Sequence, residues 1–459
     1  MSSSASDRHV DMSRTDMGHV ARRVSSLVAR SLTSERRKAL MDGLRERMRR
    51  VRGAPHRVQY FHEVSDPYSH LAAQALVPLA AHYDIEIEPR VTAVETGINR
   101  PEPELLAELA RRDCALVATH YGLEFPDDAP APDAERVRRI EQLLVAVEGG
   151  DLDTFATRAV RLGRALFTGD GAPIDAIEAE SGAGDAAQAS ARTAEAARMR
   201  ARAGHYSGAM FLYGGEWYWG VDRLHHLERR LTELGAAHEN AFLFGRPPLE
   251  TAQVERGDEI TLEIFPSLRS PYSAIGYEPA LDLAKATGIR RITRPVLPMV
   301  MRGVPASLAK GLYIFRDTKR EASCLGMPFG RMVDPIGEPV RRAFSLWPWA
   351  QSKGRGESLL ASFMRGAWSE GIDTSTDAGL RAVAERAGLD WAEAKSHLGD
   401  PAWEDELEAN RLAMVGEMGQ WGVPSFRLKG PEGEPDFVVW GQDRLWVLSR
   451  EIQRRGRAG

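Results

Sequence analysis

The chain has 459 residues, of which 43% are hydrophobic and 27% charged, and this composition is typical of globular proteins. At roughly 100 to 200 residues per domain, the length predicts two or three domains, each large enough to fold without metals or disulfides. The net charge of −5 argues against a protein that coats nucleic acid. Its two cysteines, Cys114 and Cys324, form no Cys-x-x-Cys motif, which excludes a zinc ribbon, a disulfide scaffold and dithiol redox chemistry.

The first 52 residues are rich in arginine, and from Val20 onward they carry a helical apolar pattern. We expect a basic helical extension over residues 1–52 that packs on the protein or stays solvated. A helix that binds a membrane surface or a partner is the alternative. The chain has neither the apolar segment of a secretory signal nor the run of about 18 apolar residues that spans a membrane. The sequence therefore predicts a cytoplasmic protein with no stable membrane insertion.

Two pairs of similar segments divide the rest of the chain. Residues 58–69 and 261–273 each combine a β-like run with an Asp-Pro-Tyr-Ser or Ser-Pro-Tyr-Ser motif, so that Asp66 and Ser270 lie 204 residues apart. Residues 219–224 and 440–445 share the pattern Trp-Gly-x-Asp-Arg-Leu, at a spacing of 221 residues. Two matched pairs in the same order predict a tandem duplication of one structural unit.

Each half has the same predicted order of elements. In the first half these are a strand at 58–61, a helix at 68–83, a strand at 85–91, a long helical stretch, a hairpin at 209–213 and 217–219, and a helix from Asp222. The second half repeats them at 260–265, 272–287 and 291–296, followed by helices, a hairpin at 425–428 and 437–440, and a helix from Asp443. This order predicts an α/β protein with two tandem thioredoxin-like domains, each with an inserted all-helical subdomain. We place the domains at 53–238 and 258–459, with a linker at 239–257 that is rich in Pro, Gly and charged residues.

Ser270 lies before Pro271 at the predicted start of a helix. A serine followed by proline at this position is typical of an ordinary N-cap. The same geometry has a functional interpretation, because a hydroxyl beside the unpaired N–H groups of a helix N-terminus holds an anion such as a thiolate and lowers its pKa. The residues alone leave both interpretations open.

Two further motifs have both a structural and a functional interpretation. Pro424, in Gly422-Val423-Pro424-Ser425-Phe426, fits the start of a strand, but the backbone of Val423 is also free to pair with a peptide-like ligand. Asp443 fits an N-cap, but its carboxylate also suits the ammonium group of a ligand. A metal site at His225-His226 is not expected, since no further metal-ligating residue lies at a useful spacing in the sequence.

The second half resembles the glutathione-dependent branch of the DsbA-like thioredoxin superfamily, which contains the 2-hydroxychromene-2-carboxylate isomerases and the kappa-class glutathione transferases. The resemblance covers most of residues 258–455. The motifs that carry it are Ser270-Pro271-Tyr272-Ser273, Lys310-Gly311-Leu312-Tyr313 with Asp317 behind it, Gly422-Val423-Pro424-Ser425-Phe426 and Trp440-Gly441-Gln442-Asp443-Arg444-Leu445. It implies glutathione as cofactor, with Ser270 hydrogen-bonded to its sulfur. It also implies that Val423, before a cis-proline at Pro424, pairs with the cysteinyl backbone, and that Gln442, Asp443 and Lys310 complete the glutathione site.

The sequence departs from the family pattern in both halves. In the second half, Met301 stands where the family often has Asn, nine residues before Lys310, and Gln442 stands before the aspartate where Ser or Asn is common. In the first half, Asp66 replaces the serine, and a carboxylate there would repel a thiolate. Tyr206 is predicted to take the position of the proline. We expect a degenerate copy that supplies the surface of a second subunit, as an intrachain pseudo-dimer; a separate ligand site is the alternative.

The resemblance implies a reaction in which glutathione thiolate adds to a carbon conjugated with a carbonyl, the bond rotates, and the thiolate leaves. We expect Arg302 or Lys310 to hold the carboxylate of a small aromatic or unsaturated substrate. Tyr313 and the aromatic residues Phe315, Trp347 and Trp349 would line its apolar wall or form the core of the helical subdomain. A kappa-like transferase and a non-catalytic binding or scaffold protein are the alternative functions.

Overall fold

The computed structural model describes residues 17–457 and divides into two compact units. The N-terminal unit comprises Ala39–Pro247 and Ser307–Tyr313, and the C-terminal unit comprises Pro248–Ala306 and Ile314–Gly459 together with the chain up to Lys38. The boundary between Pro247 and Pro248 falls inside the predicted linker. Within the described residues 17–52, the division between the units falls after Lys38.

The N-terminal unit is built on a four-stranded sheet. Its strands are β1 (His56–His62), β2 (Ile85–Val91), β3 (Met210–Tyr213) and β4 (Glu216–Trp219), in the order β2-β1-β3-β4. β1 and β2 are parallel, whereas β3 is antiparallel to β1 and to β4. Its helices are α3 (Pro67–His82), α9 (Leu224–Glu233) and the insertion of α4 (Pro103–His120), α5 (Ala134–Val145), α6 (Leu152–Thr168), α7 (Ala172–Ser181) and α8 (Ala186–Arg202).

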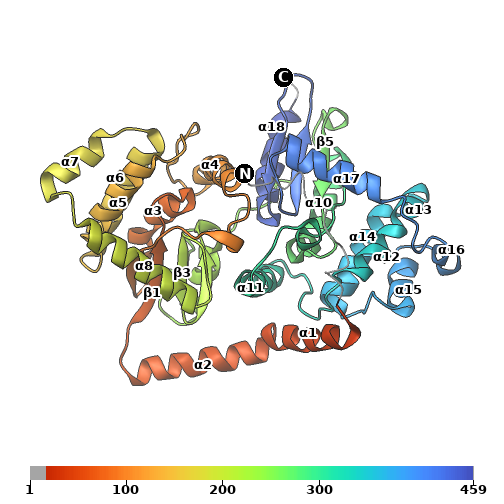
Figure 1. The fold of residues 1–459 in the computed structure, drawn as a ribbon, viewed down its shortest axis with the longest axis horizontal. Helices are drawn as coiled ribbons and strands as arrows, with labels where there is room; N and C mark the ends of the chain where they lie inside the picture. Colours follow the sequence, from red (N-terminus) through yellow and green to blue (C-terminus); the bar gives the residue numbers. More distant parts are fainter. Residues whose placement is uncertain (1–16, 458–459) are drawn as a thin grey trace. The chain divides into compact units, whose positions relative to one another are not determined.

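The C-terminal unit has a second sheet with the same plan (Figure 1). Its strands are β5 (Thr261–Phe265), β6 (Arg290–Thr293), β7 (Ser425–Lys429) and β8 (Phe437–Trp440), in the order β6-β5-β7-β8. β5 pairs in parallel with β6 and antiparallel with β7. Its helices are α10 (Pro271–Thr287), α18 (Leu445–Arg455) and the insertion of α11 (Leu308–Cys324), α12 (Glu338–Ser345), α13 (Trp347–Ser352), α14 (Gly356–Arg365), α15 (Asp377–Arg386), α16 (Trp391–Lys395) and α17 (Glu404–Leu412).

The central strand β5 shows why the second sheet forms. Leu262, Ile264 and Phe265 are fully buried, as expected for a strand covered on both faces. The buried Glu263 on the same strand pairs with Arg427 of β7 and with Arg294, so its charge is compensated. β6 lies at the edge of the sheet and exposes Arg290 and Arg291, which discourages pairing with another chain. The two sheets, each with its own helices, confirm the predicted α/β thioredoxin-like fold.

The N-terminal extension forms two helices, α1 (His19–Leu32) and α2 (Glu35–Val51). In α1 the buried guanidinium of Arg22 donates hydrogen bonds to the carbonyls of Asp334 and Ile336, so α1 is held by the C-terminal unit. α2 has no buried residue. The expected packing on the protein therefore applies to α1, whereas α2 keeps its apolar side chains exposed.

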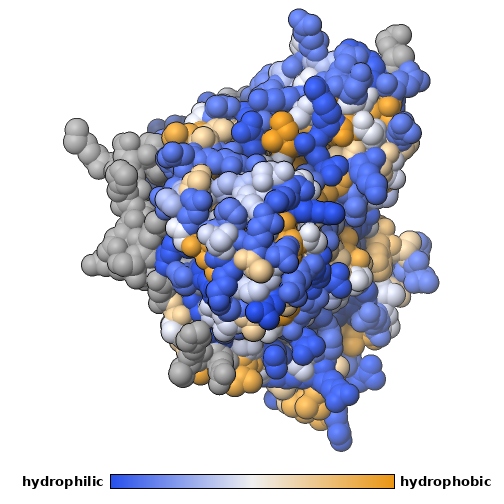
Figure 2. All heavy atoms as spheres, turned by 90° about the vertical axis from the view of Figure 1, so that its right-hand side faces the viewer, coloured by the Kyte–Doolittle hydropathy of each residue, from blue (hydrophilic) through white to orange (hydrophobic). Residues whose placement is uncertain are grey.

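The surface mixes hydrophilic and hydrophobic side chains. On the face that Figure 2 shows, the hydrophobic side chains form small patches between hydrophilic ones. Within residues 17–457, none of the helices has the length and apolar character needed to cross a bilayer.

Candidate active site

Ser270 caps the N-terminus of α10. Its hydroxyl accepts a hydrogen bond from the N–H of Ser273 at 3.1 Å and donates one to the carbonyl of Val423, also at 3.1 Å. Pro271 follows at the first helical position, where no N–H is needed. The N-cap interpretation is therefore confirmed. The bond to Val423 also joins the helix end to the loop before β7, which brings two of the predicted site residues together.

The backbone of Val423 forms the second part of this site. The Val423-Pro424 peptide bond is cis, and the Pro424 carbonyl accepts a hydrogen bond from the N–H of Gly441. The Val423 side chain packs in a hydrophobic cluster with Phe265 and Met414. No hydrogen-bond partner for the Val423 N–H exists among residues 17–457. The loop therefore offers one unpaired backbone donor close to the Ser270 hydroxyl.

Close packing holds α10 against the neighbouring loops. A Cβ atom on Gly276 would lie 2.7 Å from the Cβ of Gln442 and 3.5 Å from the Cγ of Pro424. Only glycine leaves room for this approach. Gly422 is similarly confined, because its Cβ would lie 2.0 Å from the indole ring of Trp440. These two glycines bring the helix, the cis-proline loop and the segment after β8 to one place.

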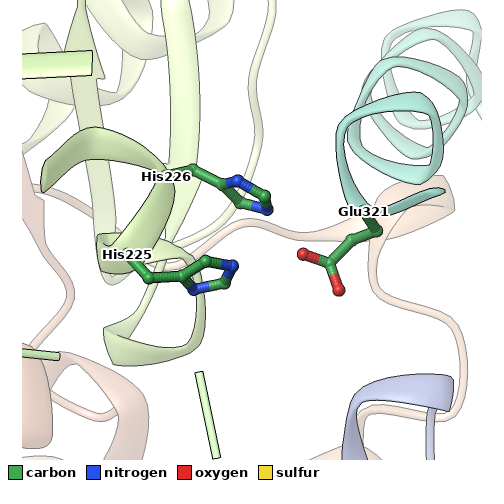
Figure 3. A group of neighbouring side chains, drawn as sticks. All are labelled: His225, His226 and Glu321. Carbon is green, nitrogen blue, oxygen red and sulfur yellow. The ribbon is translucent and has the colours of Figure 1, made fainter. Parts of the chain in front are cut away.

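Gln442 and Asp443 belong to a short 3₁₀ helix, η8 (Gln442–Arg444). The buried amide of Gln442 donates a hydrogen bond to the carboxylate of Glu321 at 2.8 Å. Figure 3 shows this carboxylate projecting from α11. The prediction that Asp443 is an N-cap is wrong: Gly441 precedes η8, and α18 begins only at Leu445. The 3₁₀ turn leaves the Asp443 carboxylate partly exposed, at 3.8 Å from Arg444.

The family comparison matches this part of the chain. A family model described as a DSBA-like thioredoxin domain matches residues 261–453. Residues 261–453, the DsbA-like domain, therefore have a DsbA-like thioredoxin fold. A curated 2-hydroxychromene-2-carboxylate isomerase from Sphingobium xenophagum is 27% identical over 199 residues, which cover 41% of this chain and 95% of that protein.

Two solved structures each resemble part of the chain. A probable DsbA oxidoreductase from Streptomyces coelicolor is 24% identical, with a TM-score of 0.34 over 43% of this chain and 89% of its own. A 2-hydroxychromene-2-carboxylate isomerase is 19% identical, with a TM-score of 0.35 over 42% of this chain and 95% of its own.

Arg302 is buried in the DsbA-like domain, and its guanidinium binds backbone carbonyls. Nε donates to Leu297 and Nη2 to Trp421, each at 2.8 Å. Burial lowers the pKa of Arg302 to about 10. Trp421 lies two residues before Val423, so this hydrogen bond fixes the start of the cis-proline loop. Two of its N–H groups are thus already used by the protein.

Lys310 and Tyr313 lie in the first turns of α11. Most of this helix belongs to the C-terminal unit, but Ser307–Tyr313 is grouped with the N-terminal unit. The Lys310 ammonium group is 3.4 Å from the carbonyl of Asn99 and 5.9 Å from the centre of the Tyr206 ring. Burial lowers the pKa of Lys310 to about 8. The ring centres of Tyr313 and His205 lie 4.5 Å apart, with the two rings perpendicular. These two predicted site residues are therefore grouped with residues of the other unit.

The indole groups of Trp347 and Trp349 lie in the helical insertion of the domain. Trp347 donates to Glu406 and Trp349 to Glu393, each at 3.0 Å, and both rings are buried. Their burial fits core residues of the helical insertion better than the wall of a substrate site.

Sequence reasoning missed a buried cluster on α11. The Tyr272 hydroxyl donates to the Asp317 carboxylate at 2.8 Å, and Arg320 donates to the other oxygen at 2.6 Å. The N-terminal unit contains the same hydrogen bond between Tyr68 and Asp113, at 2.7 Å. Both pairs are 45 residues apart in sequence; this repeated spacing marks the positions as equivalent but does not show that the side chains meet.

The N-terminal unit has a counterpart of the Ser270 site with different chemistry. Asp66 caps α3 and accepts hydrogen bonds from the N–H groups of Tyr68 and Ser69 and from the Ser69 hydroxyl. Burial, and secondly the charge of Glu63, raise the pKa of Asp66 to about 7. A Cβ on Gly208 would lie 2.6 Å from Glu63 and 2.9 Å from Asp66, so the space beside this helix end is filled.

The position predicted for Tyr206 is wrong. The strand register pairs Phe61 with Met210 and Phe265 with Ser425. Ala209 therefore takes the position of Pro424, and its carbonyl accepts the N–H of Gly220 as the Pro424 carbonyl accepts that of Gly441. Tyr206 therefore lies three residues before the position that was predicted for it, directly before β3.

His225 and His226 lie in α9 of the N-terminal unit, with their ring centres 3.9 Å apart (Figure 3). Arg229 is hydrogen-bonded to Nδ1 of His226 at 2.5 Å. The absence of a metal site remains a prediction.

Proposed function

We propose that the DsbA-like domain binds glutathione and isomerises a double bond in a small aromatic or unsaturated carboxylate. The observation that carries this proposal is the Ser270 hydroxyl at the N-terminus of α10, beside the backbone of Val423. A thiolate at this helix end would meet both the hydroxyl and the positive end of the helix dipole, which stabilise its charge. The curated relative from Sphingobium xenophagum is named for such a substrate, 2-hydroxychromene-2-carboxylate.

The Val423 backbone suits the cysteinyl residue of an extended tripeptide. Its N–H is unpaired within the described chain, and its carbonyl accepts only the Ser270 hydroxyl there. Pairing with a ligand backbone would use both groups, as in the addition of a strand to a sheet edge. Rotation about the Cβ–Oγ bond then turns the Ser270 O–H from Val423 towards the ligand sulfur. The partly exposed Asp443 carboxylate would hold the γ-glutamyl ammonium group.

The proposed reaction is balanced without oxidation or hydrolysis. The thiolate forms a C–S bond to the substrate carbon, and the electron pair of the double bond moves to the conjugated carbonyl oxygen. The former double bond then rotates as a single bond. When the electron pair returns, the C–S bond breaks and glutathione leaves unchanged. Arg302 contributes by supporting the loop that holds Val423, since its guanidinium already binds the carbonyls of Leu297 and Trp421.

Calorimetric titration with reduced glutathione tests the proposal. We expect Ser270→Ala and Asp443→Ala each to weaken binding at least about tenfold, since each removes a charge-assisted hydrogen bond. Ser270→Ala also removes an N-cap, at a cost of about 1 kcal/mol. Thr376→Ala is the matched control, because Thr376 caps α15 in the same way by accepting the N–H of Gly379. It should lose similar stability and keep full glutathione affinity.

Three results would contradict the proposal or narrow it. No binding by the wild type at millimolar glutathione would favour the scaffold alternative. Unchanged binding by Asp443→Ala would show that the site is misplaced. Product analysis then separates the two enzymes, because a kappa-like transferase leaves the substrate joined to sulfur, whereas an isomerase regenerates free glutathione.

We also propose that the two units derive from one duplicated unit. Their sheets share the same strand order and the same parallel and antiparallel pairs. The hydrogen bonds Tyr68–Asp113 and Tyr272–Asp317 join corresponding positions in both. On this proposal, the N-terminal copy lost the serine at the helix end and kept its packing, with Asp66 as the cap.

A further inference from the structure

α2 carries an exposed apolar stripe on one side. The exposed residues are Leu40, Met41, Leu44, Met48 and Val51, whose exposed fractions lie between 40% and 81%. At about 100° per residue, they occupy a sector of about 100° on the helix. A continuous stripe of large apolar side chains in water is unfavourable and marks an interaction surface.

Basic residues border this stripe on both sides. Arg36 and Arg47 lie along one edge and Lys38 and Arg45 along the other. All four are exposed, and Arg45 also pairs with Asp42 at 3.3 Å. Arg37 lies within the stripe itself. Residues 19–52 hold eleven Arg and Lys and only three Asp and Glu, in a chain whose net charge is −5. Residues 19–52 thus carry a net positive charge in a chain that is acidic as a whole.

The acidic residues of α2 lie on its opposite side. Glu35, Asp42 and Glu46 are centred about 170° from the stripe. Asp42 forms an ion pair with Arg230 of the N-terminal unit at 2.9 Å, and Glu46 binds Arg49 and Arg50 of the helix itself. Asp42 and Glu46 are only partly exposed, whereas the arginines beside the stripe are exposed. The helix therefore has an outer side that is both apolar and cationic.

We propose that the outer side of α2, defined by Leu40, Met41, Leu44, Met48 and Val51 and their basic neighbours, binds the surface of an anionic phospholipid bilayer. A helix lying in the interface buries its apolar stripe among the acyl chains, while the flanking Arg and Lys side chains reach the lipid phosphates. This inference is independent of the proposed enzymatic function.

Charge favours a bilayer over the other occupants. In a second copy the same stripe is bordered by the same positive charges, so two stripes placed face to face would repel each other at their edges. A nucleic acid would satisfy the arginines but leave the five apolar side chains against a polar backbone. An anionic bilayer supplies both an apolar interior and a negative surface.

Vesicle sedimentation of the full-length protein tests this proposal, with phosphatidylcholine vesicles and with mixed phosphatidylcholine and phosphatidylglycerol vesicles. We expect the wild type to sediment with the mixed vesicles only, and to be released by added salt. Leu44→Glu should lower the partition coefficient at least about tenfold. Arg47→Gln should lower it about fivefold. Leu412→Glu is the matched control: Leu412 is 50% exposed and Leu44 is 49% exposed. It should sediment like the wild type.

Two outcomes would overturn the proposal. One is a wild type that stays in the supernatant with both kinds of vesicle. The other is a wild-type dimer, seen by analytical ultracentrifugation, that Leu44→Glu dissociates while vesicle binding is absent; a second copy would then be the occupant. Thermal unfolding of each variant checks that it is folded. Should Leu44→Glu prove unstable, Arg47→Gln decides the question, because it alters no apolar contact.

Discussion

At the scale of single residues, the two helix N-termini show how one substitution changes the chemistry of a site. Ser270 and Asp66 occupy corresponding positions, and both accept hydrogen bonds from the first N–H groups of their helix. The serine is neutral, so the positive helix end remains available to an anion. The aspartate becomes negatively charged above its raised pKa of about 7, and the buried Glu63 lies beside it. Only the Ser270 position therefore suits a thiolate.

The raised pKa of Asp66 leads to a stability prediction. Its folded-state pKa of about 7 lies above the ordinary value of 3.8, so the folded state holds this proton more tightly. The stability from that proton is fully present below pH 3.8 and is lost as the pH rises through 7. We expect Asp66→Asn to raise the free energy of unfolding at pH 8 by about 1–2 kcal/mol, which raises the melting temperature by a few degrees. This gain should shrink as the pH falls to 4.

Asp133→Asn provides the control for this measurement. Asp133 caps α5 through the N–H of Arg136, but its side chain is exposed. Thermal unfolding at a series of pH values should show no comparable gain for this variant. A pH-independent effect of Asp66→Asn would mean that Asp66 is not titrating near neutral pH.

At the scale of elements, the contact between α10 and η8 positions the candidate site. It depends on Gly276, since any side chain there would collide with Gln442. Gln442 is itself held by its hydrogen bond to Glu321 of α11. The helix that carries Ser270, the 3₁₀ turn that carries Asp443 and the insertion are therefore coupled through a few buried contacts.

We expect Gly276→Ala to destabilise the C-terminal unit by about 1–3 kcal/mol, because the added methyl group overpacks this contact. The change of Gly311 to alanine, in α11, should instead stabilise the protein. A Cβ at Gly311 meets nothing within 4 Å, and alanine is the better helix former by about 1 kcal/mol. Denaturant unfolding measures both variants. Equal effects of the two substitutions would show that the Gly276 contact is not tight.

At the scale of the whole molecule, two compact units with separate sheets predict two unfolding transitions. Each unit has its own buried core. The division between Pro247 and Pro248 falls in a segment without helix or strand, whereas those after Lys38 and Tyr313 fall inside α2 and α11. On the proposed function, only the C-terminal unit binds glutathione. Scanning calorimetry should then show one transition whose temperature rises with glutathione. The ligand should stabilise that unit by about 2.7 kcal/mol at a concentration of 100 times Kd.

Two variants identify the transitions in the same experiment. Asp66→Asn should change the temperature only of the transition that glutathione leaves unchanged. Gly276→Ala should lower the temperature only of the transition that glutathione raises. Movement of both transitions by either variant, or a single transition throughout, would contradict independent unfolding of the units.

The local sequence pattern determined most of the secondary structure. β2, β8 and α10 lie within one residue of their predicted ranges, because apolar periodicity and the Ser-Pro and Asp-Pro starts are local signals. β6 ends at Thr293 instead of 296: the chain leaves the strand at Arg294-Pro295, and the Val296 N–H bonds to Pro266. The helices after Asp222 and Asp443 start later than expected because a 3₁₀ turn precedes each.

By itself the sequence determined the fold class, the repeated order of elements and the position of Ser270 at a helix start, since all three depend on neighbours close in the chain. The tertiary structure alone decided which residues meet across long separations. Strand register gave Ala209 the position of Pro424, and packing grouped Lys310 with Asn99. The tyrosine–aspartate bonds likewise join two helices that no local pattern connects. Such contacts follow from how whole elements pack, and a single sequence does not encode that packing in any short segment.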